Sequence, residues 1–367
     1  MTSPRSSTPV AQRRLPFGVR LAIWGLVGII LYYAFLVAAQ YFTNPNAPDA
    51  FNNSIKTSAQ QVSNALVLGA IYALVALGYT MVYGIIELIN FAHGDVFMMG
   101  AFLAVLFAGA GAGSIPGLLN LSGPVENPLL LVVYMAATLI VVMPLTGLLN
   151  LTIERVFYRP FRNASRLAPL ITAVGVSFIL QNVALVLFGS GDRNAPQIFP
   201  LNWRIDLLGA SIPLLNFVIL VIALGLMFLL QTFVRRTRMG RAMRATALDQ
   251  QASKLMGVDV NQTIALTFAI GGALAGAAGT VWGYNFGFVR QDLGFNAGLK
   301  SFTSAVLGGI GNITGAVLGG FVIGFIENFA ASLGLTRWAE FSVFVALTLV
   351  LVFRPAGILG QQVGERA

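Results

Sequence analysis

Long apolar runs recur along almost the whole chain, and they constrain the fold more than any other feature of the sequence. A run of about 20 apolar residues can cross a bilayer, and it must do so as a helix because lipid offers no partners for backbone N–H and C=O groups. Of the 367 residues, 57% are hydrophobic and only 10% are charged, whereas soluble domains are about 25% charged. The sequence therefore predicts an all-α polytopic membrane protein without a sizeable soluble domain.

The apolar pattern predicts about nine or ten helical membrane segments. They are expected at 18–40, 62–83, 96–110, 128–150, 168–188, 213–234, 262–286 and 338–353, with a broken helix near 301–330. That last stretch is interrupted by the Gly-rich sequence Leu307–Gly315. We interpret it as a half-helix, a turn and a second helix, since broken helices occur at membrane depth where they face protein or a water-filled path. The polar stretch 43–58 is expected to separate the first two helices.

Positive charge is concentrated in a few short segments. The net charge is +9, and the arginines cluster in the N-terminus, in the loop 151–167 and in the loop 235–259. Lys and Arg are enriched in cytoplasmic loops, so we expect all three segments to be cytoplasmic. Nucleic acid is not an expected partner, because the same charge is explained by this loop pattern.

The N-terminal region has two readings. Residues 1–17 are polar and are expected to be disordered and cytoplasmic. Arg13 and Arg14 before the apolar run, together with Val37-Ala38-Ala39 near its end, are compatible with a cleaved signal peptide. We favour an uncleaved transmembrane helix over 18–40, because the run is nearly of bilayer length and contains aromatic residues.

Several kinds of chemistry are excluded by residue content. The chain has no cysteine and a single histidine, His93, so thiolate and multi-histidine metal sites are ruled out. It also contains no Gly-x-x-x-x-Gly-Lys-Ser/Thr sequence that would bind ATP phosphates. We expect no metal, no cofactor and no enzymatic activity in this chain.

The loop 235–259 contains a short amphipathic element. Asp249 is expected to cap a helix over Gln250–Met256, and Gly257 to end it in a left-handed conformation. Such an element can fit a groove in a partner; alternatively, it lies at the headgroups with its arginines beside anionic lipid. The candidate partner contacts are Arg241, Arg244, Asp249, Ala252, Leu255 and Gly257.

Polar groups are also crowded into Glu87–Asp95, between the second and third expected helices. Ionisable groups inside a membrane often mark a path or gate. The alternative is a cytoplasmic turn in which Asp95 favours the positive end of a helix dipole. The candidate substrate-pathway residues are Asn90, His93 and Asp95, together with Gly309, Gly311 and Asn312 of the Gly-rich turn.

Four separated segments, Gly69–Gly84, Ile89–Asp95, Arg238–Gly257 and Phe302–Gly315, occur in this order. Together they resemble the branched-chain amino-acid ABC transporter permease family, the high-affinity leucine/isoleucine/valine type, and especially its first permease subunit. The similarity spans about 60–360, so the helix over 18–40 is additional to the family's usual start. The chain departs from the family at Thr314, where the Gly-rich stretch usually has proline.

The resemblance implies a permease subunit of an ATP-driven importer for branched-chain or related apolar amino acids, in a bacterial-type inner (plasma) membrane. Its implied partners are a second homologous permease, two cytoplasmic ATPase subunits that hydrolyse the ATP, and an external solute-binding protein, besides membrane lipid. The transmembrane domain would cover 60–360. The loop matching 238–257 contacts the ATPase in this family, which makes 235–259 the coupling loop.

Two alternatives stay open at this point. A permease for urea or short-chain amides belongs to the same family and has similar membrane subunits. A stand-alone ion-coupled carrier is an alternative of another class, in which Glu87, His93, Asp95 and Glu327 would serve as ion or proton relays.

Overall fold

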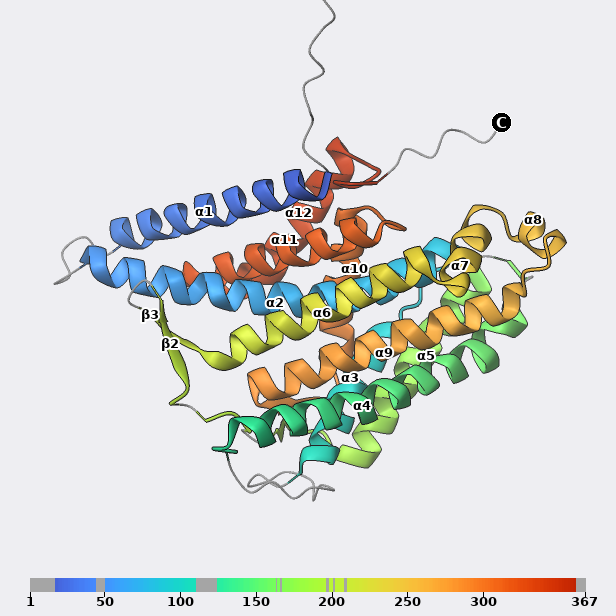
Figure 1. The fold of residues 1–367 in the computed structure, drawn as a ribbon, viewed down its shortest axis with the longest axis horizontal. Coiled ribbons are helices and arrows are strands. Elements are labelled where there is room, and N and C mark those ends of the chain that lie inside the picture. The colour runs from blue at the N-terminus through green and yellow to red at the C-terminus, as the bar shows by residue number, and fades with distance from the viewer. Residues whose placement is uncertain are drawn as a thin grey trace, which may run out of the picture.

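The computed structural model is a bundle of long helices whose axes run in broadly the same direction (Figure 1). It describes residues 17–43, 50–109, 124–162, 164–165, 167–195, 198–200, 202–207 and 210–360. The expected disorder of 1–17 falls outside these residues except for Phe17. Seven described helices are long and apolar enough to cross a membrane, and two shorter apolar helices accompany them. The expected all-α polytopic fold is confirmed.

The twelve α-helices of the described residues follow the expected segments closely. They are α1 (Phe17–Thr43), α2 (Ala50–Ile86), α3 (His93–Ala108), α4 (Pro128–Ile153), α5 (Leu167–Phe188), α6 (Leu214–Arg236), α7 (Arg238–Leu248), α8 (Gln250–Leu255), α9 (Val260–Phe286), α10 (Leu293–Gly308), α11 (Ile313–Ser332) and α12 (Ala339–Phe353). Short helical turns are η1 (Glu154–Tyr158), η2 (Arg159–Phe161) and η3 (Thr336–Trp338).

Two small antiparallel sheets lie among the connections between these helices. One pairs β1 (Arg193–Asn194) with β4 (Phe288–Val289), and the other pairs β2 (Arg204–Leu207) with β3 (Ala210–Pro213). The β2–β3 hairpin lies at the end of the bundle opposite α7 and α8 (Figure 1). These strands were not predicted from the sequence.

The start of α2 differs from expectation, because residues 50–58 are helical rather than a polar break. Two polar residues of this segment, Ser54 and Ser58, are buried. The Ser58 hydroxyl donates to Oε1 of Gln40 at 3.2 Å, and Ala59 packs with Ile212 of β3. Contacts with α1 and the hairpin therefore extend α2 beyond its apolar part.

The broken helix is confirmed. Between α10 and α11 the backbone turns at Gly309 (φ 103°) and Gly311 (φ 89°), conformations that favour glycine. The Asn312 side chain then caps α11 by accepting hydrogen bonds from the backbone N–H groups of residues 314 and 315, at 3.1 and 3.2 Å. Nδ2 of Asn312 also donates to the carbonyl oxygen of Leu359 at 2.9 Å, and this bond holds the C-terminal segment against the turn.

A second short helix inside the bundle was not recognised as such from the sequence. Helix α3 begins at His93, whose ring lies against Gly78 of α2 and Gly271 of α9. The chain must therefore turn back into the bundle after α2 ends at Ile86. Helices α3 and α10 each have 16 residues. They contact each other at Gly94 and Gly294, where a Cβ added to Gly94 would lie 2.3 Å from the Gly294 carbonyl oxygen.

The partners of α3 and α10 are arranged in a similar way. Helix α11 packs closely on α2, and α4 packs closely on α9. The pairs run antiparallel, as shown by the contacts of Gly69 with Gly324 and of Ala73 with Gly320 in one pair. This arrangement is the one expected for two repeats that each contain a long helix, a short re-entrant helix and another long helix.

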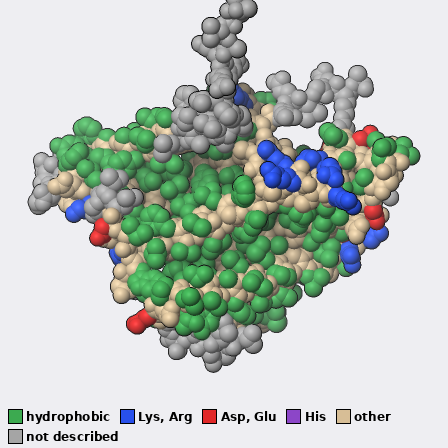
Figure 2. All heavy atoms as spheres, in the orientation of Figure 1, with side chains coloured by type: hydrophobic (Ala, Val, Ile, Leu, Met, Phe, Trp, Pro, Cys, Tyr) green, Lys and Arg blue, Asp and Glu red, His purple; other side chains and the backbone are tan. Residues whose placement is uncertain are grey.

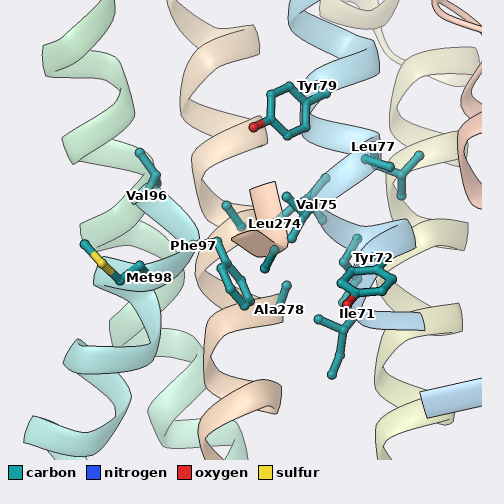
Figure 3. Packing of buried hydrophobic residues seen from close by; sticks show 14 of the residues in the cluster. Ile71, Tyr72, Val75, Leu77, Tyr79, Val96, Phe97, Met98, Leu274 and Ala278 are labelled. Atoms are coloured by element: carbon teal, nitrogen blue, oxygen red, sulfur yellow. The ribbon is translucent and has the colours of Figure 1, made fainter. Parts of the chain in front are cut away.

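Helices α2 and α9 form the centre of the bundle. Figure 3 shows Tyr72 and Val75 of α2 near Phe97 of α3 and Leu274 and Ala278 of α9. Small residues let the backbones approach closely: a Cβ on Gly100 would be 2.6 Å from the Cα of Gly276. The bundle is therefore held by packing between helices that are mostly shielded from lipid.

The outer helices α4, α5, α6 and α12 carry many exposed apolar side chains. Ile140, Val186 and Val221 are each about 70% exposed or more, as expected of lipid-facing residues. Figure 2 shows hydrophobic side chains across the body of this face, whereas Lys and Arg side chains gather at the end that carries α7. This separation of apolar and basic surface fits a membrane-spanning bundle with one basic end.

Candidate functional site

The loop 235–259 forms two helices, α7 and α8, at the basic end of the bundle. Thr237 separates α6 from α7, and its hydroxyl oxygen accepts from the backbone N–H of Gly240 at 3.0 Å. A Cβ at Gly240 would lie 2.3 Å from the Val234 carbonyl oxygen, so glycine permits the close turn between the two helices. Met243 and Thr246 are buried, which fixes α7 against the transmembrane helices.

Helix α8 has the expected caps. Oδ1 of Asp249 accepts from the backbone N–H groups of Gln251 and Ala252 at 2.7 and 3.0 Å. Gly257 follows the helix in a left-handed conformation, with φ 81°. These features confirm the predicted helix geometry and orient α8 at the surface.

The tip formed by α7 and α8 is apolar and uncovered. Leu255 is 90% exposed, Met256 is 84% exposed and Leu248 is 73% exposed. Ala252 is exposed beside them, as is Arg241 on α7. Such a cluster of large exposed apolar side chains at a basic end is typical of a protein-binding surface.

Two hydrogen bonds connect this tip with the transmembrane helices. Nε2 of Gln250 donates to the carbonyl oxygen of Ile85 in α2 at 2.9 Å. A guanidinium nitrogen of Arg244 donates to the carbonyl oxygen of Val234 in α6 at 2.7 Å. A displacement of α8 would therefore act on the end of α2.

A small cavity of about 90 Å³ lies between α7, α2 and the Gly-rich turn. Arg244 and Met243 line it from α7, Thr80 and Gly84 from α2, and Gly311 from the turn. The structure thus brings one candidate coupling residue, Arg244, close to one candidate pathway residue, Gly311.

The other candidate pathway residues lie deeper in the bundle. Asn90, His93 and Asp95 are 2%, 0% and 0% exposed. Oδ1 of Asn90 accepts from the Tyr158 hydroxyl at 2.9 Å. The Asp95 carboxylate accepts from the Ser177 hydroxyl and from Nε2 of Gln181, the latter at 3.1 Å.

These bonds place the start of α3 against η1 and α5, and Asp95 lies in the first turn of α3. The Gly-rich turn approaches a different level of α2, where a Cβ on Gly84 would be 3.4 Å from the Cα of Gly311. The six candidate pathway residues therefore form two groups and not one cluster.

The sequence was compared with known proteins. A family described as "Branched-chain amino acid transport system / permease component" matches residues 61–353. The chain belongs to this permease family. This membership favours a permease subunit over a stand-alone carrier, and a transport protein of the inner membrane over an enzyme.

The relatives of this permease include characterised bacterial transport subunits. It is 42% identical over 310 residues to the high-affinity branched-chain amino acid transport system permease protein BraD of Pseudomonas aeruginosa, covering 84% of this chain and 97% of BraD. It is 41% identical to LivH of Escherichia coli strain K12, with the same coverage. No solved structure matched the permease.

Several polar residues of the permease that the sequence analysis missed support the start of α3. Tyr158, Ser177 and Gln181 bond Asn90 or Asp95, and Asn150 connects Asn90 to the backbone of α9. Polar side chains inside otherwise apolar helices were the available signal. Their partners are far away in the sequence, so spacing did not reveal them.

A further set of interacting polar side chains lies between α2, α10 and α11. Nζ of Lys300 lies 2.6 Å from Oε1 of Glu327, and the Tyr72 hydroxyl donates to Oε2 at 2.7 Å. The Glu327 carboxylate therefore faces neighbouring helices of the permease.

Proposed function

We propose that this permease is the transmembrane subunit of an ATP-driven importer for branched-chain or related apolar amino acids. The exposed tip of Leu248, Leu255 and Met256 is the observation that carries the proposal. It supplies a docking surface for a partner, and the chain itself has no P-loop. The relatives named as branched-chain amino acid permeases support the cargo class.

The proposed complex contains a second homologous permease, two ATPase subunits and an external solute-binding protein. The basic end with α7 and α8 is cytoplasmic in this proposal, in line with the distribution of Lys and Arg. The N-terminus of α1 lies on the same side. The domain boundaries follow: α1 precedes a transmembrane domain over about 60–360 that carries the coupling loop 235–259.

Energy would reach the transmembrane helices by contact. ATP binding closes the two ATPases and displaces α7 and α8. Arg241 of α7 and Ala252 and Leu255 of α8 contact the partner, and Asp249 and Gly257 hold the ends of α8. Gln250 transmits the displacement to α2 through Ile85, and Arg244 transmits it to α6 through Val234. The cavity beside Gly311 lets the Gly-rich turn respond.

The cargo path would open beside two groups of residues. Asn90, His93 and Asp95 are covered by neighbouring helices here, so they reach a path only if α3 moves relative to α5 and η1. Gly309, Gly311 and Asn312 form the second group, at the end near α7. Polar groups at these two levels would serve the ammonium and carboxylate of an amino acid.

Reconstitution in liposomes tests this proposal. Leucine should accumulate only when the permease is assembled with its co-purified partners, the external binding protein and ATP. Urea and acetamide are tested as alternative cargoes. Accumulation of either one instead of leucine would refute the amino-acid cargo class and favour an amide transporter. Gradient-driven accumulation by the permease alone would refute the dependence on ATPases.

A further inference from the structure

Helix α1 lies before the part of the chain that matches the family, which begins at residue 61. It packs on α2, and two of its aromatic residues contact the second half of α11. The Tyr32 hydroxyl donates to the Phe325 carbonyl oxygen at 3.3 Å, and the rings of Tyr32 and Phe325 lie 4.8 Å apart. Phe35 approaches Phe329 in the same way, with ring centroids 5.4 Å apart.

This packing encloses a groove of about 400 Å³ between α1, α11, η3 and α12. Apart from the Trp338 indole nitrogen, its side-chain polar atoms are the hydroxyls of Tyr32 and Ser342, and both already donate to backbone carbonyl oxygens. The groove is lined by Tyr32, Phe35, Phe325, Ile326, Phe329, Ala330, Leu333, Leu335, Trp338, Phe341 and Ser342. A polar ligand would find few partners here.

The groove opens toward the lipid-facing side of the bundle. Phe35, Trp338 and Phe341 are 58%, 59% and 59% exposed. An apolar groove that opens toward lipid is filled most favourably by a hydrocarbon chain, which supplies van der Waals contacts that an unfilled space lacks.

One arginine is adjacent in the sequence to residues that line the groove. Arg337 is in η3, between the lining residues Leu335 and Trp338, and its side chain is exposed. It makes no ion pair with any described residue, and the nearby Glu340 carboxylate lies 3.7 Å from Lys300. Trp and Arg side chains commonly lie at headgroup level, and a guanidinium binds phosphate through two parallel hydrogen bonds.

We propose that a phospholipid of the surrounding bilayer binds in this groove, with one acyl chain along α1, α11 and α12 and its phosphate at Arg337. Helix α1 forms one wall, so the site depends on a segment outside the family match. The bound lipid continues the packing between α1 and α12, where the protein alone leaves a gap.

Native mass spectrometry of the purified permease complex tests the site, with phosphatidylglycerol as the added probe. The complex should retain one phosphatidylglycerol per copy of this chain after detergent washing. Arg337→Gln should lower that occupancy at least fivefold. Arg354→Gln, which removes an exposed arginine at the other end of α12, should leave it unchanged.

A filling variant tests the acyl-chain part separately. Ser342→Phe places a ring in the groove and should abolish the retained lipid while Arg337 is still present. Diacylglycerol should compete poorly, because it lacks the phosphate. Equal retention in the native chain, Arg337→Gln and Ser342→Phe would overturn the proposal, and binding of diacylglycerol as tight as that of phosphatidylglycerol would overturn the role of Arg337.

Discussion

Lys300 of α10 and Glu327 of α11 form an ion pair inside the bundle, with Nζ 2.6 Å from Oε1. Their side chains are only 12% and 17% exposed, and Tyr72 of α2 bonds the second carboxylate oxygen. The Glu327 carboxylate thus connects α2 of one repeat with α10 and α11 of the other. A poorly solvated charge is costly when its partner is removed.

Glu327→Gln is therefore expected to destabilise the permease by about 3 kcal/mol, because it leaves the Lys300 charge without its closest partner. Denaturant unfolding in detergent measures this loss. The exchanged pair Lys300→Glu with Glu327→Lys should recover part of it. Glu340→Gln is the control: Glu340 is 63% exposed and 3.7 Å from Lys300, so its loss should cost less than about 1 kcal/mol.

The α8 tip gives a prediction about transport rather than stability. Leu255→Ser should reduce ATP-dependent uptake at least tenfold, because a partner would lose an apolar contact from a side chain that is 90% exposed. Thermal stability should stay unchanged, since the side chain packs on little of its own chain. Gln251→Ser on the same short helix is the matched control, and equal uptake by both variants would contradict docking at Leu255.

Local sequence signals predicted most helices and their ends. Asp249 and Gly257 define α8, and Gly309, Gly311 and Asn312 define the break before α11, because capping and left-handed turns depend on neighbouring residues. The re-entrant start of α3 depends instead on distant contacts. His93 fits there because Gly78 lacks a side chain, and a single sequence does not show which glycine faces which helix.

The side-chain partners of the candidate residues also could not be predicted from the sequence. Asn90 was singled out, but its bond to Tyr158 joins residues 68 positions apart. Glu327 was named only as a candidate relay group and Lys300 was not named, although the two form an ion pair. In each case the energetic cost of a polar group in lipid was a usable signal, while the identity of its partner depended on the packing of the helices.

The end of α8 gives a prediction about backbone conformation. Gly257 has φ 81°, and a Cβ there would contact nothing within 4 Å, so conformation and not space restricts substitution. Gly257→Asn should retain most ATP-dependent uptake, because asparagine adopts the left-handed conformation readily. Gly257→Val should lose most of it through misorientation of α8, as β-branched residues strongly disfavour positive φ. Equal uptake by the two variants would contradict a need for this conformation.

The contact between Gly78 and His93 provides the last prediction. A Cβ on Gly78 would lie 2.2 Å from Nε2 of His93, whereas a Cβ on Gly271 would meet nothing closer than 3.4 Å. Gly78→Ala should therefore destabilise the permease by about 1–3 kcal/mol through overpacking, and Gly271→Ala should have little effect. His93→Ala in the Gly78→Ala background should restore part of the stability, measured by denaturant unfolding as a double-mutant cycle. Strictly additive effects of the two substitutions would show that the histidine ring is not what excludes a side chain at position 78.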